Sequence, residues 1–319
     1  METHTYSPLI EDANAVLLRI IPRDSLSRSL GKYFDKAAPD GVVSGDYEMW
    51  RCTQTGLEFA RPMVPGSTVF YNWIASVPGY YPANRWEYQW VVDRLAGRAV
   101  RPKVADVGCG DGKFLRLLLD QRDAAVLGFD TLEASVEKCR AKGVDAHCGL
   151  IGDLLQADPS LHHAFDCVTS FHCLEHVPDP LGFMRELCSL LKPGGLLCVS
   201  TPLSPMPFES VWFDPQNHPP HHMTRWNVSA YRRMAELLAM DVEFHFSKPS
   251  GLVKSLYWAW RLRILGGPFV RPGVRHWRQI AWETFRLPYT AWQFARGWRG
   301  SDSPGSDGVL VCLRSTAKS

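Results

Sequence analysis

Short apolar runs alternate with segments of helical periodicity from about residue 100 to residue 247. The runs at 104–107, 125–129 and 165–170 have the length and composition of buried strands, and an amphipathic stretch follows each of the first two. Such alternation is typical of βαβ units, in which helices cover a parallel sheet. We therefore predict an α/β fold with a doubly wound, mostly parallel sheet, whose ligand lies beyond the carboxyl ends of the strands.

Composition divides the chain into four parts. Residues 1–95 are rich in Pro, Gly and aromatic side chains, and we expect an irregular region that ends in a helix. Residues 96–247 hold the alternating core. Residues 248–308 are rich in Trp and Arg and suggest a helical insertion, and residues 309–319 hold a last strand. Within the core and beyond it, we expect strands at 145–148, 196–200, 242–246 and 309–314, and helices at 86–95, 112–121, 132–142, 181–191 and 227–240.

The overall composition is that of an ordinary globular protein, with 45% apolar and 21% charged residues among 319. Nine cysteines without paired spacing indicate reduced thiols rather than a disulfide framework. The first ten residues lack the layout of a signal peptide, and no apolar run reaches the roughly 18 residues of a membrane span. We expect a cytoplasmic protein, with peripheral contact at the inner face of a membrane as an option.

A glycine-rich turn follows the first strand of the core. The strand ends in Asp106, and Gly108, Gly110 and Gly112 lead into a helix. Glycines allow bare backbone to approach a ligand and tolerate positive φ angles. By itself this string also fits a dinucleotide site or a plain tight turn.

The charges around the turn favour one cofactor. A nicotinamide site has the spacing Gly-x-Gly-x-x-Gly and binds a pyrophosphate at the helix N-terminus. Here the spacing is Gly-x-Gly-x-Gly, and Asp106 and Asp111 would repel a pyrophosphate. Both suit the ammonium and sulfonium of S-adenosylmethionine, and Asp130, at the end of the second strand, can accept hydrogen bonds from ribose hydroxyls. We therefore predict S-adenosylmethionine as the cofactor.

With these stretches the chain resembles the class I S-adenosylmethionine-dependent methyltransferases, in the broad group related to ubiquinone-biosynthesis methyltransferases. The resemblance covers roughly residues 100–202 and implies a seven-stranded sheet, with 309–314 as the inserted last strand. One departure is that Leu150 and Ile151 follow the third strand, where the family often has an acidic residue. The matching stretches are Ala105–Gly112, Gly128–Asp130, Leu174–Pro180 and Leu191–Gly195.

The resemblance also implies which residues surround the cofactor. The glycine turn lines the methionine end, Asp130 holds the ribose, and the residues after the third strand lie near the adenine. The implied cofactor-binding residues are Asp106, Gly108, Cys109, Gly110, Asp130, Thr131, Gly149, Leu150, Ser170, Phe171 and His172.

A second, weaker resemblance concerns residues 52–62. Relatives carry a zinc-ribbon-like Cys-x-x-Cys-Gly there, whereas this chain has Cys52 and then Thr55. One thiolate cannot build a tetrahedral zinc site, so we interpret the segment as a metal-free remnant.

Two histidine clusters are candidates for the catalytic site. His172 and His176 match the H-x-x-E-H string of certain zinc peptidases, but that string requires a helix and here it follows a strand directly. We therefore predict no metal and keep His172 as an active-site candidate. Histidine is suited to proton transfer at neutral pH, and His221 and His222 lie between the fifth strand and the next helix, where acceptors bind.

Relatives show a similar segment at that position, so we predict His221 or His222 as the base or an acceptor anchor. Arg225 and Trp226 are the predicted substrate-binding residues, since an arginine can pair with a carboxylate or phosphate. The alternative is that the whole segment only packs and caps the following helix.

The segment 248–299 has ten Lys and Arg against one acidic residue, Glu283, and six of the twelve tryptophans. Three interpretations remain open: a lid or dimer surface, contact with an anionic membrane, and, least favoured, nucleic-acid binding. The oligomeric state is left open.

We predict a methyltransferase that uses S-adenosylmethionine for O- or C-methylation of a small-molecule, sugar or lipid-linked acceptor. The alternatives are a non-catalytic S-adenosylmethionine-binding module and a nicotinamide-dependent oxidoreductase.

Overall fold

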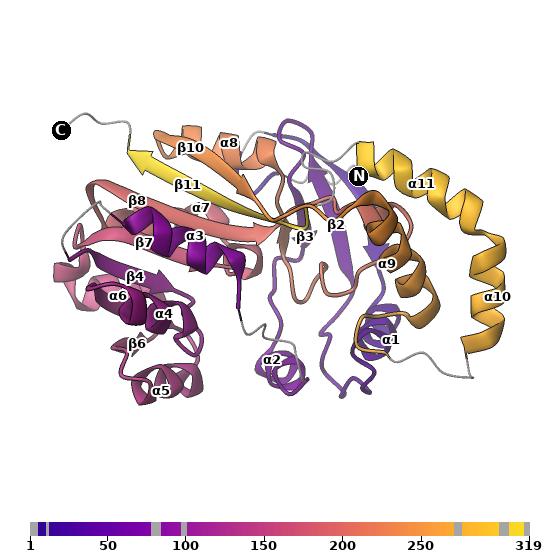
Figure 1. Cartoon of the computed structure of the whole chain (residues 1–319), viewed down its shortest axis with the longest axis horizontal. Coiled ribbons are helices and arrows are strands. Elements are labelled where there is room, and N and C mark those ends of the chain that lie inside the picture. The colour runs from indigo at the N-terminus through magenta and orange to yellow at the C-terminus, as the bar shows by residue number, and fades with distance from the viewer. Residues whose placement is uncertain are drawn as a thin grey trace. The chain divides into compact units, whose positions relative to one another are not determined.

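The fold was analysed in a computed structural model that describes residues 6–10, 13–77, 84–96, 101–270, 276–299 and 306–315. The chain forms two compact units, each made of three separate segments (Figure 1). The seven-stranded unit comprises Ala83–Thr201, Tyr231–His245 and Gly308–Ser319. The four-stranded unit comprises Met1–Pro82, Pro202–Ala230 and Phe246–Asp307.

The seven-stranded unit has the α/β architecture predicted from the alternation of apolar runs. Its sheet has the order β10-β11-β8-β7-β4-β5-β6, and the pairs β4–β5, β4–β7, β5–β6 and β7–β8 are parallel. The last strand, β11, lies between β8 and β10 and runs opposite to both (Figure 1). The strands are β4 (Lys103–Val107), β5 (Ala125–Asp130), β6 (Ala146–Cys148), β7 (Phe165–Phe171), β8 (Leu191–Pro202), β10 (Met240–Phe246) and β11 (Gly308–Ser315).

Five of the helices of this unit lie at the predicted places, whereas α6 was not predicted. One core cluster packs α3, α4 and α5 against the sheet through buried side chains such as Val91, Leu118 and Val136. The amphipathic pattern of 112–121 explains this, because Phe114, Leu115 and Leu118 share the buried face. The helices are α3 (Trp86–Leu95), α4 (Lys113–Gln121), α5 (Glu133–Ala141), α6 (Ile151–Ala157), α7 (Pro180–Leu190) and α8 (Val228–Leu237).

The N-terminal region is not irregular, as the composition suggested, but forms most of a four-stranded antiparallel sheet with the order β1-β2-β3-β9. Its first strand lacks a strict alternation of buried and exposed residues, so local periodicity is weak. Its last strand, β9 (Thr224–Arg225), comes from far along the chain. Two helices complete the core of this unit with side chains such as Leu30 and Phe70. The N-terminal elements are β1 (Ala15–Ile21), α1 (Arg23–Phe34), β2 (Tyr47–Cys52), β3 (Glu58–Arg61) and α2 (Thr68–Ala75).

The zinc-ribbon-like segment forms the hairpin between β2 and β3. Thr55, which stands where a zinc ribbon has its second cysteine, is buried, and its hydroxyl accepts a hydrogen bond from the Leu57 N–H at 3.2 Å. Thr55 therefore shapes the turn.

The Trp/Arg-rich segment is helical, as expected. It forms α9 (Leu252–Leu265), α10 (Trp277–Phe285) and α11 (Leu287–Arg299), and α9 and α11 pack on the short helix η3 (Pro207–Ser210) through Ala259 and Phe294. Among the described residues no helix is long and apolar enough to cross a membrane.

A buried ion-pair network ties β9 to the rest of its unit. Arg225 faces Glu58 across the β3–β9 pair, and its Nη1 lies 2.8 Å from Glu58 Oε2. Its Nη2 donates to Glu209 of η3, and Nη1 also lies 3.0 Å from His218 Nε2. All three charged side chains are less than 10% exposed. Two carboxylates thus surround one guanidinium in the interior, where an unpaired charge is costly.

We expect Arg225→Met to lower the free energy of unfolding by about 3–5 kcal/mol, because it leaves the buried carboxylate of Glu209 without its cation and that of Glu58 with Arg51 alone. Urea denaturation measures the change. The control is Arg233→Met, which removes the exposed pair with Glu236 (2.9 Å) and should cost about 1 kcal/mol or less. Equal losses in the two variants would show that the network adds nothing beyond a surface pair.

Candidate active site

The sheet of the seven-stranded unit has a switch point beside β4. The chain proceeds from β4 to β5 and β6 on one side, and then places β7 on the other side of β4. The loops after β4 and β7 therefore leave the sheet in opposite directions and open a crevice at the carboxyl edge, where ligands bind in such folds. The register places Val107 opposite Phe129 and Asp106 opposite Thr169, so the predicted cofactor residues meet at this edge.

The glycine turn after β4 is held by the end of β5. Gly108 N and Cys109 N donate to the Phe129 carbonyl at 2.8 and 3.0 Å. Gly110 N donates to Asp130 Oδ2 at 2.8 Å, and Leu132 N donates to Asp130 Oδ1 at 2.9 Å. The Asp130 carboxylate is thereby fixed in place. A carboxylate has about four lone-pair sites, so Asp130 can accept a further donor.

Three glycines of this region have different neighbours. A Cβ on Gly108 (φ +78°) would lie 3.0 Å from Cys173 Sγ, and one on Gly112 (φ +74°) would lie 2.5 Å from Cys139 Sγ. A Cβ on Gly110 (φ +55°) would meet no atom within 4 Å. Packing thus accounts for Gly108 and Gly112, whereas Gly110 borders open space.

Asp106 lies behind the turn and is 2% exposed. Thr169 Oγ1 donates to its Oδ1 at 2.7 Å. Burial, together with the nearby charge of Asp130, raises the pKa of Asp106 to about 7, although the Thr169 hydrogen bond opposes the shift. A cation bound close to this group would favour its charged form.

Asp111 contributes less negative charge than the sequence argument assumed. Lys142 Nζ lies 2.8 Å from Asp111 Oδ2 and donates to the Asp111 carbonyl at 2.7 Å. Lys142 therefore largely compensates the charge of Asp111, and Asp106 and Asp130 are the carboxylates that disfavour a pyrophosphate.

Other predicted cofactor residues are placed as follows. Cys109 is buried, with its Sγ 2.8 Å from the position of a Cβ on Gly128, so only its backbone belongs to the turn. Phe171 is 8% exposed and packs edge-on against Phe114 and Tyr88, with ring centroids 5.0 Å apart in both pairs. Ser170 is fully buried.

The ends of β5 and β6 carry exposed apolar side chains. Leu150 is 63% exposed and follows Gly149, whose N–H donates to the Asp130 carbonyl at 2.9 Å. Leu132, which the sequence analysis did not single out, is 45% exposed, and Thr131 before it is also exposed. Apolar surface beside Asp130 suits the flat face of a base.

His172 is held between two buried carboxylates. Its Nε2 lies 3.0 Å from Glu87 Oε1 and its Nδ1 lies 3.5 Å from Glu175 Oε1. Burial lowers the pKa of His172, but the two carboxylates outweigh it and raise that pKa above its usual value. The two carboxylates thus favour the imidazolium form of His172 more than an ordinary histidine does. As predicted, the H-x-x-E-H stretch is not α-helical: it leaves β7 and forms the short 3-10 helix η2 (Leu174–His176).

Two further residues, Glu87 beside His172 and Cys173 beside Gly108, were not predicted from the sequence. Glu87 lies on α3 and is 2% exposed. The spacing of Glu87, Val91 and Leu95 is a signal that could have found it, because it places a carboxylate on the apolar face of a helix. Nothing in the sequence marks Cys173, whose role depends on its approach to Gly108.

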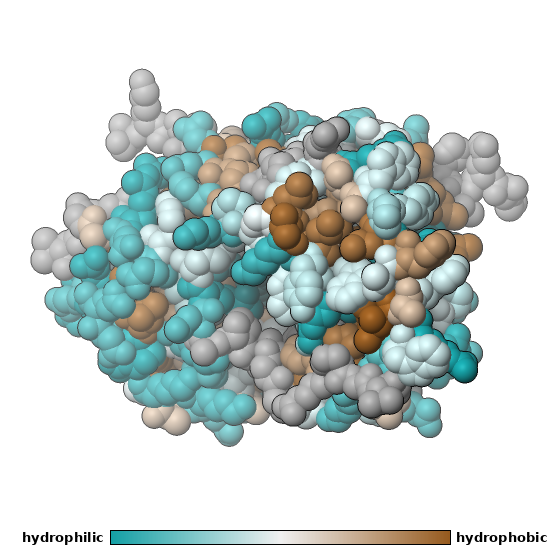
Figure 2. All heavy atoms as spheres, turned by 45° about the vertical axis from the view of Figure 1, so that its right-hand side comes forward, coloured by the Kyte–Doolittle hydropathy of each residue, from teal (hydrophilic) through white to brown (hydrophobic). Residues whose placement is uncertain are grey.

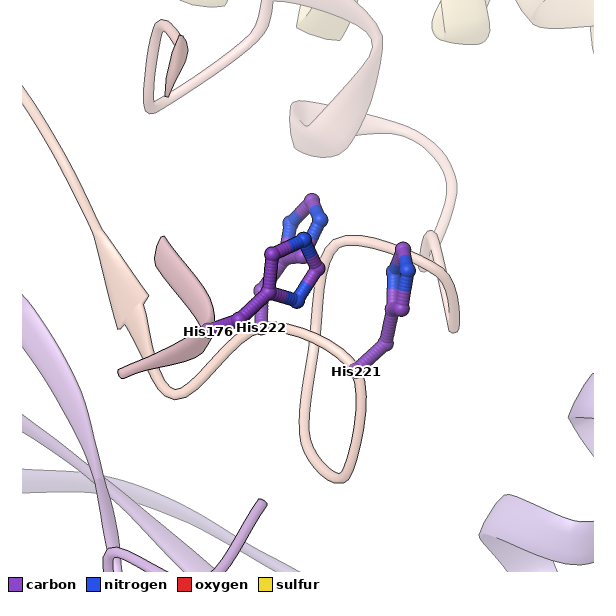
Figure 3. Close-up of side chains that lie close together, drawn as sticks. All are labelled: His176, His221 and His222. Atoms are coloured by element: carbon purple, nitrogen blue, oxygen red, sulfur yellow. The ribbon is translucent and has the colours of Figure 1, made fainter. Parts of the chain in front are cut away.

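In the four-stranded unit, His221 and His222 lie in one loop with stacked rings, 4.4 Å between centroids (Figure 3). His221 Nδ1 lies 2.9 Å from the Gln216 carbonyl and His222 Nδ1 lies 2.8 Å from Asn217 Oδ1. Both partners only accept, so each Nδ1 carries the hydrogen. In the neutral rings Nε2 is then the basic nitrogen.

The predicted substrate-binding residues are both buried. Arg225 is engaged by Glu58 and Glu209, and Trp226 is 0% exposed with its Nε1 donating to Thr224 Oγ1 at 2.9 Å. Beside Arg225 lies a pocket of about 230 Å³. It is lined by Arg19, Glu209, Val211, Trp212, Phe213, His218 and Arg225.

The groups at the carboxyl edge of the sheet fit the chemical groups of S-adenosylmethionine. Gly110 borders open space, the carboxyl groups of Asp106 and Asp130 suit a cation and ribose hydroxyls, and Leu150 offers apolar surface.

Comparisons with known proteins place this chain near methyltransferases. Residues 84–240 match the model of a family described as a methyltransferase domain. A Mycolicibacterium smegmatis protein named "Probable S-adenosylmethionine-dependent methyltransferase" is 32% identical over 172 residues, which cover 53% of this chain and 64% of that protein. The ubiquinone biosynthesis O-methyltransferase of Neisseria meningitidis is 36% identical over 31% of this chain and 43% of its own length. That of Xanthomonas campestris is 38% identical over 34% and 48%.

The chain spans about two fifths to two thirds of the length of these curated relatives. Among solved structures, an S-adenosylmethionine-dependent methyltransferase from Archaeoglobus fulgidus aligns with 71% of this chain and 94% of its own, at 17% identity and a TM-score of 0.46. The family match begins at residue 84, so the zinc-ribbon-like resemblance of residues 52–62 has no support from it. Residues 84–240 thus match a methyltransferase-domain family, and this stretch contains the cofactor residues of the carboxyl edge.

Proposed function

We propose that this chain transfers a methyl group from S-adenosylmethionine to a small-molecule, sugar or lipid-linked acceptor. The observation that carries the proposal is the open backbone at Gly110, whose N–H is fixed on Asp130 at the switch point of the sheet. The relatives named ubiquinone biosynthesis O-methyltransferases favour an oxygen as the methylated atom.

The cofactor would supply a methyl group on a sulfonium, and the chain's part is to hold and align the reactants. Asp106 and Asp130 would hold the cationic and ribose ends. An acceptor hydroxyl must also lose its proton, which requires a base. We assign that role to His221 or His222, because histidine is suited to proton transfer at neutral pH and the Nδ1 of each ring is fixed by an oxygen acceptor.

The acceptor side of the proposal rests on the four-stranded unit. Its pocket combines the rings of Trp212 and Phe213 with the exposed cation of Arg19, which lies 5.4 Å from the Phe213 centroid. An aromatic or anionic acceptor group suits this lining. Arg225 is a weaker anchor than the sequence suggested, because two carboxylates already offset its charge.

We expect calorimetry to show that Gly110→Ala weakens S-adenosylmethionine binding about tenfold or more, because the new methyl group enters the open space at the turn. Its fold should lose only about 1–2 kcal/mol for the positive φ. Gly143→Ala is the matched control, since Gly143 also has positive φ (+74°) and no atom within 4 Å of a Cβ. It should bind the cofactor normally. Absence of binding by the wild type, or equal weakening in both variants, would refute the site.

Cofactor affinity should fall about fivefold between pH 7 and pH 6, because Asp106, with its pKa raised to about 7, becomes protonated in the free protein. Binding of a cation favours the carboxylate, so protons are released on binding below pH 7. The α-amino group of the ligand stays charged in this window.

Titration calorimetry in buffers of different ionisation enthalpy counts the released protons. Asp106→Asn should bind weakly and without pH dependence in this range, while it retains His172, whose pKa is also raised. A pH dependence that persists in Asp106→Asn would assign it to another group.

Metabolites of cells that lack this protein should include a compound one CH2 group lighter than its counterpart in wild-type cells. Restoring the gene should reverse the change. We expect a gene encoding both His221→Ala and His222→Ala to fail, whereas one encoding His163→Ala, in the other unit, should succeed. Cofactor binding without any such metabolite would favour the alternative of a non-catalytic binding module.

A further inference from the structure

The helices α10 and α11 carry a stripe of exposed aromatic and arginine side chains. Trp282, Phe285, Tyr289 and Trp292 are 56%, 79%, 50% and 54% exposed. Their spacing of three and four residues places them on one side of a helix. Helical hydrogen bonds continue through the junction, since Arg286 N donates to the Trp282 carbonyl and Thr290 N to that of Arg286. The aromatic–arginine stripe consists of Arg278, Trp282, Phe285, Arg286, Tyr289, Trp292 and Arg296.

The opposite side of these helices is the one that packs on the protein. Phe294 is 1% exposed and lies in a cluster with Val211 and Ala259, and Thr290 is also buried. The stripe is therefore not needed for the core. Figure 2, which brings this side forward, shows apolar side chains and side chains of intermediate hydropathy gathered on the surface. A second exposed set on α9 comprises Leu252, Val253, Tyr257 and Trp258, with Val253 at 81%.

The exposed charges of segment 248–299 are all positive. The only acidic residue of segment 248–299 is Glu283, which is 6% exposed and bound by Arg263 through two contacts of 2.6 and 3.0 Å. The arginines of the stripe lie against its rings: Arg286 is 5.8 Å from the centroids of both Trp282 and Tyr289, and Arg296 is 4.9 Å from that of Trp292. Arg271 and Arg275 lie outside the described residues.

We propose that the aromatic–arginine stripe binds the surface of an anionic lipid bilayer. Aromatic side chains settle at the boundary between headgroups and acyl chains, and arginines attract anionic headgroups. Phe285 and Val253 are exposed hydrocarbon side chains that a bilayer would cover. The inference does not depend on methyl transfer.

Two other occupants fit the surface less well. A second copy of the same face would place arginine against arginine, because a twofold interface joins identical patches. Nucleic acid would require open ring faces for base stacking. In the stripe, Trp282 stacks on Phe285 and Tyr289 on Trp292, with interplanar angles of 26° and 25°, so each ring already has a face against its neighbour.

The test is cosedimentation of the purified full chain with vesicles of phosphatidylcholine alone or mixed with phosphatidylglycerol. We expect binding at least about tenfold tighter to the anionic vesicles, weakened by salt. Arg278→Glu with Arg296→Glu should reduce it about tenfold or more. The control is Arg23→Glu with Arg28→Glu on α1, which makes the same change of charge on exposed arginines elsewhere and should retain binding.

Insertion of the stripe into the bilayer is tested separately from its electrostatic attraction to anionic headgroups. Acyl chains labelled with bromine should quench tryptophan fluorescence in the wild type, and Phe285→Ser with Trp292→Ser should bind weakly and lose most quenching. Val16→Thr with Ile20→Thr, at exposed apolar positions of β1, is the control and should behave as the wild type. Equal binding to neutral vesicles, absence of binding, or loss in both controls would overturn the proposal. Self-association or RNA binding through the stripe without lipid binding would overturn it as well.

Discussion

The parallel pairing of β4 with β5 and β7 determines the shape of the cofactor edge. Phe129 at the end of β5 accepts the N–H groups of Gly108 and Cys109, and Asp130 accepts that of Gly110. The turn is therefore shaped by its neighbouring strand and not only by its glycines. Within it, Gly108 and Gly112 make room for the thiols of Cys173 and Cys139, whereas nothing in the protein occupies the space beside Gly110. The same arrangement fixes Asp130 and leaves Asp106 buried behind the turn, where its pKa rises to about 7.

The order of strands and helices in the seven-stranded unit could be predicted because it follows from local sequence patterns. Strands β4 to β7 are each followed by a helix, and parallel strands bring successive loops to one edge, so Asp106, Asp130 and Gly149 could be placed together without a structure. The directions in which the side chains point could not be predicted. Cys109 points into the core, and Asp111 is paired with Lys142, because both depend on contacts across the sheet or between loops. Glu87 was missed for the same reason, since it reaches His172 from a helix 85 residues earlier in the chain.

The four-stranded unit was not predictable in this way. Its sheet joins β3 to β9, in a register that places Glu58 opposite Arg225. A two-residue strand has no periodicity to detect. The sequence also does not distinguish an arginine that binds an anionic ligand from one that is already paired with two glutamates. The structure favours the second for Arg225, and the neutral His218 fits this, because burial and the charge of Arg225 keep the pKa of His218 well below its usual value.

The Trp/Arg-rich helices show why one sequence pattern allowed several interpretations. Their apolar residues lie on two sides: Phe294 and Ala259 pack inward, whereas Phe285 and Trp292 face outward. Because apolar residues lie on two sides, the sequence alone could not separate lid, interface and membrane contact. Burial separates the sides, and the ion pair of Glu283 with Arg263 removes the one negative charge from the exposed side. What remains outside is hydrocarbon, aromatic rings and arginine, and an anionic bilayer is the surface that satisfies all three at once. Such a surface would hold the four-stranded unit where a lipid-linked acceptor is found.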